Sequence, residues 1–178
     1  MLLTDTARSP QLSGIGRIEL CDPRLPETRQ PYHAAMGKLE TDSTKLSHRE
    51  RVVRNSSQQS LTKLLKDFWE KGFRINRAAL VVGSQIDPDD ITNPHIRAHA
   101  FEGLLFRTAV EQTLHDYKIC TDLLLERNAY PSVALRLKQS SDDLKRAIQN
   151  LGRLASAEGQ PWRAEQKLAA LAALSVLR

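Results

Sequence analysis

Cysteine is scarce in this chain of 178 residues, which contains only Cys21 and Cys120. Two cysteines in such ordinary contexts do not indicate the disulfide framework of a small secreted domain. They do not indicate a cysteine-based metal site either, because such sites need several thiolates at close spacing. A reducing compartment fits this composition, and we expect a cytoplasmic protein.

Long apolar segments are also lacking. The N-terminus has no positively charged segment followed by an apolar stretch, which a secretory signal peptide would have. No run of residues approaches the roughly 20 apolar residues that cross a bilayer. The sequence therefore predicts a soluble, unprocessed protein without a membrane partner.

The composition predicts one domain with a mildly basic surface. With 40% hydrophobic residues, the chain can build one sizeable core with loose ends. It has 26 lysines and arginines against 21 aspartates and glutamates. This excess shifts the expectation modestly toward a nucleic-acid partner, although many basic proteins bind none.

The rest of the chain is organised around the stretch 78–117. It opens with the apolar run Ala-Ala-Leu-Val-Val, closed by Gly83 and Ser84, which predicts a strand buried on both faces. Asn93 then provides a helix cap, and Pro94 stands at the first helical position. A buried strand that leads into a helix predicts a parallel α/β sheet.

The predicted helix carries a polar constellation. His95, His99 and Glu102 are spaced i, i+4 and i+7, so they project from one face. At the carboxyl edge of a sheet this face predicts a metal or phosphate site. A solvated helix face is the alternative, because the helical zinc motif has a glutamate directly after its first histidine and Ile96 stands there.

The segments before this stretch are less regular. Residues 1–14 are expected to be flexible, and alternation over 15–21 predicts a strand that ends at Asp22-Pro23. The segment 37–59 lacks periodicity and is expected to be poorly ordered. A helix capped by Ser60 and ended by Gly72 then follows.

The segments after it predict further helices. We favour a strand over a helix for 118–127, because a helix from Pro94 through Asn128 would be unusually long. Helices are expected after Pro131 and from Ser140 or Ser141 to Gly152. An alanine- and leucine-rich helix, introduced by 161–163, closes the chain.

The order of these elements resembles the RNase H-like superfamily, and in particular its Holliday-junction-resolvase-type branch. The features that carry the resemblance are the strand ending in Asp22-Pro23, the buried central strand and the last helix after Pro161-Trp162. The resemblance implies a single RNase H-like α/β domain over 15–178, with a mostly parallel central sheet flanked by helices.

The resemblance also implies a nuclease with two Mg²⁺ or Mn²⁺ ions held by carboxylates. Asp22 matches the first family position, whereas the central strand lacks its acid and Glu165 precedes the expected position in the last helix. Asp22, Glu102, Glu165 and His99 are the candidate catalytic residues. Asp22, Glu102 and His99 are the candidate metal ligands.

Three functions stay open. The chain is a metal-dependent nuclease, a catalytically degenerate relative that binds DNA or RNA, or a non-catalytic adaptor with a protein partner or a second copy of itself. The candidate nucleic-acid-binding residues are Arg49, Arg51, Arg54, Arg74, Arg77 and Arg97.

Overall fold

The computed structural model describes residues 1–6, 9–34 and 38–177. Two compact units make up the chain. Unit 1 comprises Met1–Gly16, Asn76–Gly83 and Cys120–Arg178, and unit 2 comprises Arg17–Ile75 and Ser84–Ile119. The chain therefore leaves and re-enters each unit, and each unit is built from segments that are distant in sequence.

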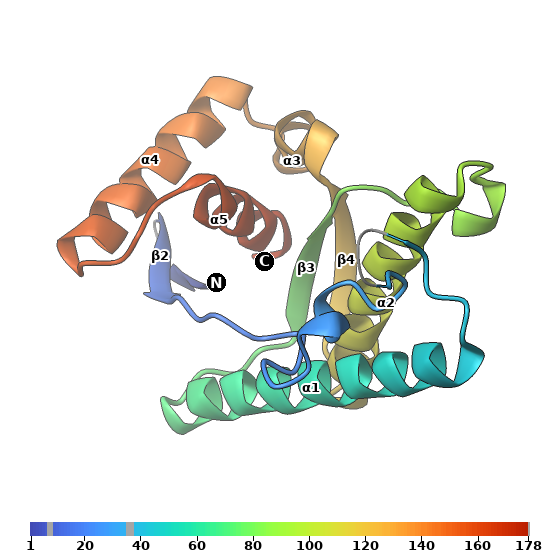
Figure 1. Ribbon diagram of the computed structural model, residues 1–178. Coiled ribbons are helices and arrows are strands. Elements are labelled where there is room, and N and C mark those ends of the chain that lie inside the picture. Colours follow the sequence, from blue (N-terminus) through green and yellow to red (C-terminus); the bar gives the residue numbers. More distant parts are fainter. Residues whose placement is uncertain (7–8, 35–37, 178) are drawn as a thin grey trace. The chain divides into compact units, whose positions relative to one another are not determined.

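Unit 1 contains two small sheets of two strands each within the described residues. Strand β1 (Leu2–Thr6) pairs antiparallel with β2 (Ser9–Gly14). Strand β3 (Arg77–Val82) pairs parallel with β4 (Cys120–Leu125), and the two lie side by side in Figure 1.

Helices provide most of the core of unit 1. After the short helix η4 (Glu126–Asn128) come α3 (Ala129–Leu137), α4 (Ser141–Ala157) and α5 (Ala164–Val176). Helix α5 packs against β3 and α3, because its small alanines allow close approach. The buried core residues are Leu3, Leu124, Ala129, Val133, Leu144, Ile148, Leu151, Ala170, Leu171, Ala172 and Leu174.

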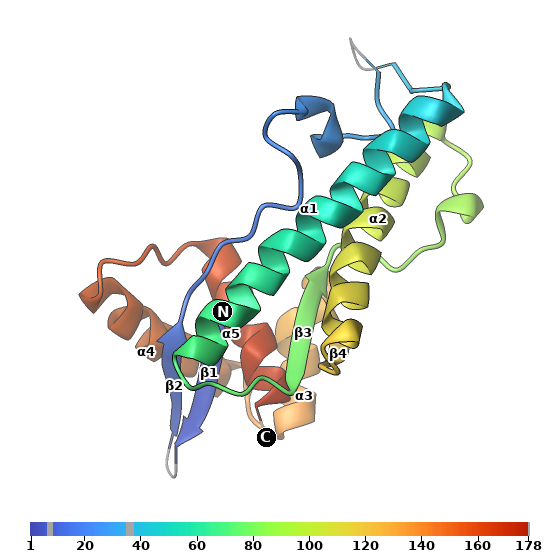
Figure 2. The same ribbon diagram turned by 90° about the horizontal axis from the view of Figure 1, so that it is seen from below.

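Unit 2 consists mainly of two long helices. They are α1 (Ser43–Glu70) and α2 (Pro94–Asp116), which lie side by side (Figure 2). Two short helices, η1 (Pro26–Arg29) and η3 (Pro88–Asp90), precede them. The buried residues of α1 recur about every fourth position, as expected for one helix face: Val53, Ser57, Leu61, Leu65 and Phe68.

The start of α2 confirms the predicted cap. The Asn93 side chain accepts hydrogen bonds from the backbone N–H groups of His95 and Ile96, at 3.0 and 3.1 Å. Pro94 stands at the first helical position, where its missing N–H leaves no bond unmade. This cap fixes where the face that carries His95 and His99 begins.

The predicted fold class is wrong. The chain is 59% helical and still mixed α/β, but its two sheets of two strands do not form a central parallel sheet flanked by helices. The apolar run of β3 suggested burial on both faces, whereas Ala78–Val82 are all half-buried. A half-buried parallel pair needs cover on one face, and α5 packs against β3.

Three local predictions also differ from the structure. In the terminus 1–14 that we expected to be flexible, 2–6 and 9–14 form β1 and β2. The predicted strand 15–21 has no regular structure. The segment 37–59 contains most of α1, although residue 37 lies outside the described residues. Polar residues such as Ser57 occupy buried positions of α1 and obscure its periodicity.

Two other expectations are confirmed. The segment 118–127 contains strand β4, and the alanine- and leucine-rich helix is present as α5. Within the part of the chain that the structure describes, no helix has the length and apolar composition needed to cross a membrane.

The contact between α4 and the segment before α5 generates a stability prediction. A Cβ at Gly152 would lie 2.5 Å from Cδ1 of Trp162, far inside van der Waals contact. We expect Gly152→Ala to lower the free energy of unfolding by about 1–3 kcal/mol. Urea unfolding followed by circular dichroism measures this change.

Gly103 on α2 is the matched control, because a Cβ there would meet no atom within 4 Å. Gly103→Ala should raise the free energy of unfolding by about 0.5–1 kcal/mol, the usual gain for alanine in a helix. Equal effects of the two substitutions would contradict the tight contact at Gly152.

Candidate metal centre

A buried carboxylate on α2 lies at the centre of a polar cluster in unit 2. Only 6% of Glu102 is exposed to solvent. Its Oε1 lies 2.8 Å from Nδ1 of His33, and its Oε2 lies 2.9 Å from Nδ1 of His99. Because an ionised carboxylate only accepts hydrogen bonds, each imidazole donates from Nδ1. One side chain therefore orients two histidine rings.

The other edges of these rings meet a third histidine. His33 Nε2 forms a hydrogen bond of 3.3 Å with His95 Nδ1, in which His95 donates because the proton of His33 is on Nδ1. The ring centroids are 4.6 Å apart for His33 and His99, 4.7 Å for His95 and His99, and 5.0 Å for His33 and His95. Among the described residues, these histidines are the one group of three or more His, Cys, Asp or Glu side chains placed to hold a metal ion, and their ligand atoms all lie within 4.8 Å of one another.

Two parts of unit 2 build this cluster. His95, His99 and Glu102 come from successive turns on one face of α2, as their spacing predicted. His33 comes from the loop between η1 and α1 and is 8% exposed. His95 and His99 are exposed, so the cluster is buried on the side of His33 and open to solvent on the other.

The nitrogen positions suit one small cation. Nitrogens bound to tetrahedral Zn²⁺ at 2.0–2.1 Å lie about 3.3–3.4 Å apart, and His33 Nε2 and His95 Nδ1 are 3.3 Å apart. Two such nitrogens can be at most about 4.2 Å apart, so side chains now within 4.8 Å must close slightly around an ion. Imidazoles bind Zn²⁺, Cu²⁺, Fe²⁺ or Ni²⁺, whereas Mg²⁺ prefers oxygen ligands.

Two of the four predicted catalytic residues meet in this cluster, Glu102 and His99. The Asp22 carboxylate instead accepts hydrogen bonds from Nε and Nη2 of Arg24, at 3.1 and 3.0 Å. These side-chain bonds, followed by the bond from the Arg24 backbone N–H, hold the pKa of Asp22 below its usual range. Glu165 is exposed in the first turn of α5 and belongs to unit 1.

The six arginines predicted to bind nucleic acid have different surroundings. The guanidinium of Arg49 is bound to two backbone carbonyls and a carboxylate. Arg77 forms an ion pair of 3.7 Å with Asp122, and Arg97 is half-buried. The remaining three are exposed: Arg51, Arg54 and Arg74.

Sequence reasoning missed His33 as a member of the site. It lies 62 residues before its contact partner His95, in a stretch without periodicity. No local spacing rule relates a loop residue to a helix that begins so far along the chain. The remaining signal was chemical, because a histidine before the helix is available to complete a set begun by His95 and His99.

Comparison with known proteins finds no relative of this chain. No protein-family model matches the sequence, and no curated protein or solved structure is significantly similar to it. The resemblance to the RNase H-like superfamily therefore receives neither support nor contradiction from these comparisons.

The cluster predicts metal binding with a defined set of residues. We expect one Zn²⁺ or Co²⁺ ion per chain, measured by isothermal titration calorimetry at neutral pH. His99→Ala removes one nitrogen ligand and should lower the affinity by more than about tenfold. Binding should also weaken in acid, because protons compete with the metal for the imidazole nitrogens.

The control is His115→Ala, on the same helix. The His115 side chain is 85% exposed and lies 4.0 Å from the Asp116 carboxylate, outside the cluster. Its replacement should leave the affinity unchanged. An equal loss in both variants, or none in His99→Ala, would show that the metal binds elsewhere.

Proposed function

We propose that this protein binds one divalent transition-metal ion of the Zn²⁺ type at His33, His95 and His99, and uses it for a hydrolytic reaction. The observation that carries the proposal is the bridge that Glu102 makes between His33 and His99. Because both Nδ1–H groups are directed to one carboxylate, both Nε2 lone pairs face away from it, and an ion bound there would replace the hydrogen bond between His33 Nε2 and His95 Nδ1. A carboxylate behind metal-binding imidazoles also raises their basicity.

The number and exposure of the ligands favour a catalytic metal over a structural one. Structural zinc sites are closed by four protein ligands, whereas catalytic sites have three and bind water at the fourth position. Three histidines compose this cluster, and His95 and His99 are exposed. A Zn²⁺ ion held by these three histidines would lower the pKa of a water at the open position toward neutral, the chemistry needed to hydrolyse an ester or a phosphoester.

This proposal modifies the nuclease hypothesis. A single ion held by imidazole nitrogens takes the place of a Mg²⁺ or Mn²⁺ pair held by carboxylates. A phosphodiester stays the favoured substrate class, because unit 2 also carries exposed arginines and the chain has a net charge of +5. Cys21 and Cys120 are both free thiols, which suits the cytoplasm as the compartment.

Glu102→Gln tests the bridge directly. A carboxamide has one oxygen acceptor, so it can accept from one of the two Nδ1–H groups, while its NH₂ faces the other ring. We expect Zn²⁺ affinity to fall about 10–100-fold. Zinc-dependent hydrolysis of bis(p-nitrophenyl) phosphate and p-nitrophenyl acetate should fall with the fraction of bound metal.

The metal-free stability of Glu102→Gln separates this role from a structural one. Replacing a buried charge by a neutral group of equal size does not require a loss of stability. We expect the melting temperature of the metal-free protein to be unchanged and its metal affinity to be lower. Full metal affinity in Glu102→Gln would refute the bridge, and zinc binding by the wild type without hydrolysis of either ester would refute the catalytic part.

Nucleic-acid binding is a second candidate function. Arg51 and Arg54 are exposed and three residues apart on α1, so they share a face of that helix. Arg51 contacts His48 through Nη2 at 3.2 Å, which adds a third basic residue to this face. Cations on one helix face can follow a phosphate backbone.

Salt dependence tests this second function. Binding to duplex and single-stranded DNA and RNA, measured by fluorescence anisotropy, should weaken as salt rises. If both arginines contact phosphates, Arg51→Gln with Arg54→Gln should reduce the slope of log K against log salt by about 1.8 for duplex DNA.

The control pair, Lys145→Gln with Arg153→Gln, removes the same charge from exposed positions of α4. An equal effect of both pairs would indicate binding by net charge alone. No binding at low salt would exclude the nucleic-acid function and favour a protein partner or a homodimer, which sedimentation measures.

A further inference from the structure

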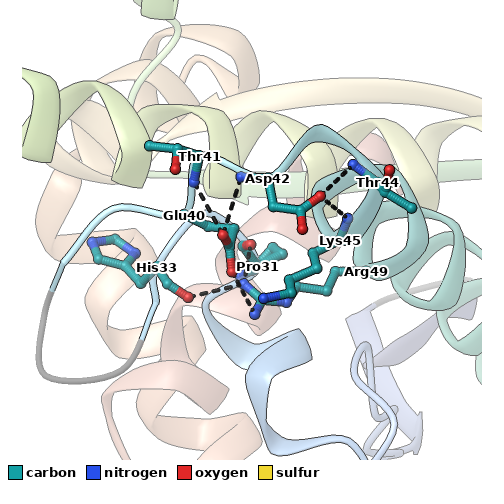
Figure 3. A network of polar contacts seen from close by, with 8 residues as sticks. All are labelled: Pro31, His33, Glu40, Thr41, Asp42, Thr44, Lys45 and Arg49. Carbon is teal, nitrogen blue, oxygen red and sulfur yellow. Dashed lines mark hydrogen bonds and ion pairs between the residues drawn. The ribbon is translucent and has the colours of Figure 1, made fainter.

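The loop that carries His33 is attached to α1 by one arginine. Nη1 of Arg49 donates hydrogen bonds to the carbonyl oxygens of Pro31 and His33, each at 3.0 Å (Figure 3). The two acceptors flank Tyr32, so one guanidinium nitrogen fixes the backbone on both sides of that residue. Because His33 is the ligand that α2 does not supply, its position depends on this loop.

A half-buried carboxylate holds the arginine in turn. Nη2 of Arg49 donates to Oε2 of Glu40 at 3.0 Å, and Oε1 of Glu40 accepts from the backbone N–H groups of Thr41 and Asp42, each at 3.1 Å (Figure 3). The Arg49 and Glu40 side chains are 13% and 9% exposed. The hydrogen bond from the backbone N–H of Asp42 is the largest of the causes that hold the pKa of Glu40 below its usual range.

Two further hydrogen bonds hold Tyr32, the residue directly before His33. The backbone N–H of Glu40 donates to the carbonyl of Tyr32 at 3.0 Å. The Tyr32 hydroxyl donates to Oε1 of Glu50 at 2.6 Å. Consecutive residues of α1, Arg49 and Glu50, therefore hold three consecutive loop residues, of which His33 is the last.

These contacts give Arg49 a different role from the phosphate contact expected from the sequence. Both of its terminal nitrogens already donate to acceptors within the protein, and its side chain is mostly buried. A guanidinium provides several donors in a rigid fork, whereas the single ammonium of lysine does not reproduce that geometry.

We propose that Arg49, held by Glu40, is a positioning residue for the metal centre, which sets the His33 ring so that Nδ1 meets Glu102 and Nε2 faces His95. The inference rests on the proposed metal function. The hydrogen bonds of Arg49 go to Pro31, His33 and Glu40 and to none of the candidate ligand nitrogens, so it would act through the backbone of His33.

A double-mutant cycle tests this role. Arg49→Lys keeps the charge and loses the fork, and should lower Zn²⁺ affinity about tenfold, in the range of other supporting residues of metal sites. In a His33→Ala background the same substitution should leave the residual affinity unchanged, because the ligand that it positions is gone. Calorimetry of the four proteins gives both values.

Arg153→Lys is the matched control, the same substitution at an exposed position of α4 in unit 1. It should leave Zn²⁺ affinity unchanged. An equal loss on Arg49→Lys in the wild-type and His33→Ala backgrounds would overturn the proposal, because it would mean a general effect on the fold. No loss in either background would also overturn it.

A metal-free measurement separates failure of this inference from failure of the proposed function. Proton–nitrogen correlation spectra of the imidazoles report which ring nitrogen carries the proton. The wild type should show His33 and His99 protonated at Nδ1. In Arg49→Met, His33 should lose this single tautomer, while His99 should still be protonated at Nδ1.

If the wild type binds no zinc, the proposed function fails, yet the spectra still decide whether Arg49 sets the His33 ring. Retention of the His33 tautomer in Arg49→Met, or equal loss of both tautomers, would reject the positioning role.

Discussion

The buried carboxylate of Glu102 is the constraint on which the rest of the candidate centre depends. A carboxylate withdrawn from water is costly unless hydrogen bonds and a countercharge compensate it. His33 and His99 supply the two hydrogen bonds, one to each oxygen. A metal ion bound by the imidazole nitrogens on the far side of these rings would supply that countercharge. Protons would compete with the metal for those nitrogens.

The sequence predicted those parts of the structure that local rules govern. The cap at Asn93 and Pro94, strand β4 and helix α5 follow from spacing and turn chemistry over a few residues. The sheet could not be predicted from such rules, because an apolar run does not reveal whether one or both faces of a strand are covered. Strand β3 is half-buried and has a single paired neighbour. The first half of helix α1 was missed because the buried Ser57 breaks the apolar pattern, whereas the helix predicted after Ser60 overlaps its second half.

The candidate metal centre also has one part that local sequence rules predict and one part that they do not. The face shared by His95, His99 and Glu102 could be predicted, since it needs only the helical repeat. The position of His33 could not, because His33 lies in a loop that hydrogen bonds from Arg49 attach to α1, and Arg49 alone suggests a surface cation. Asp22 failed as a partner for a physical reason as well: Arg24, two residues away, satisfies its carboxylate locally.

All members of the candidate centre and its supports belong to unit 2, which comprises Arg17–Ile75 and Ser84–Ile119. This unit supplies the three imidazoles, the bridging Glu102 and the Arg49–Glu40 pair behind His33. The geometry of the site is therefore set by contacts within one compact unit. Unit 1, whose core is formed by α3, α4, α5 and the strands, contributes none of these donors. Substitutions in its core should then change stability without changing which atoms bind a metal.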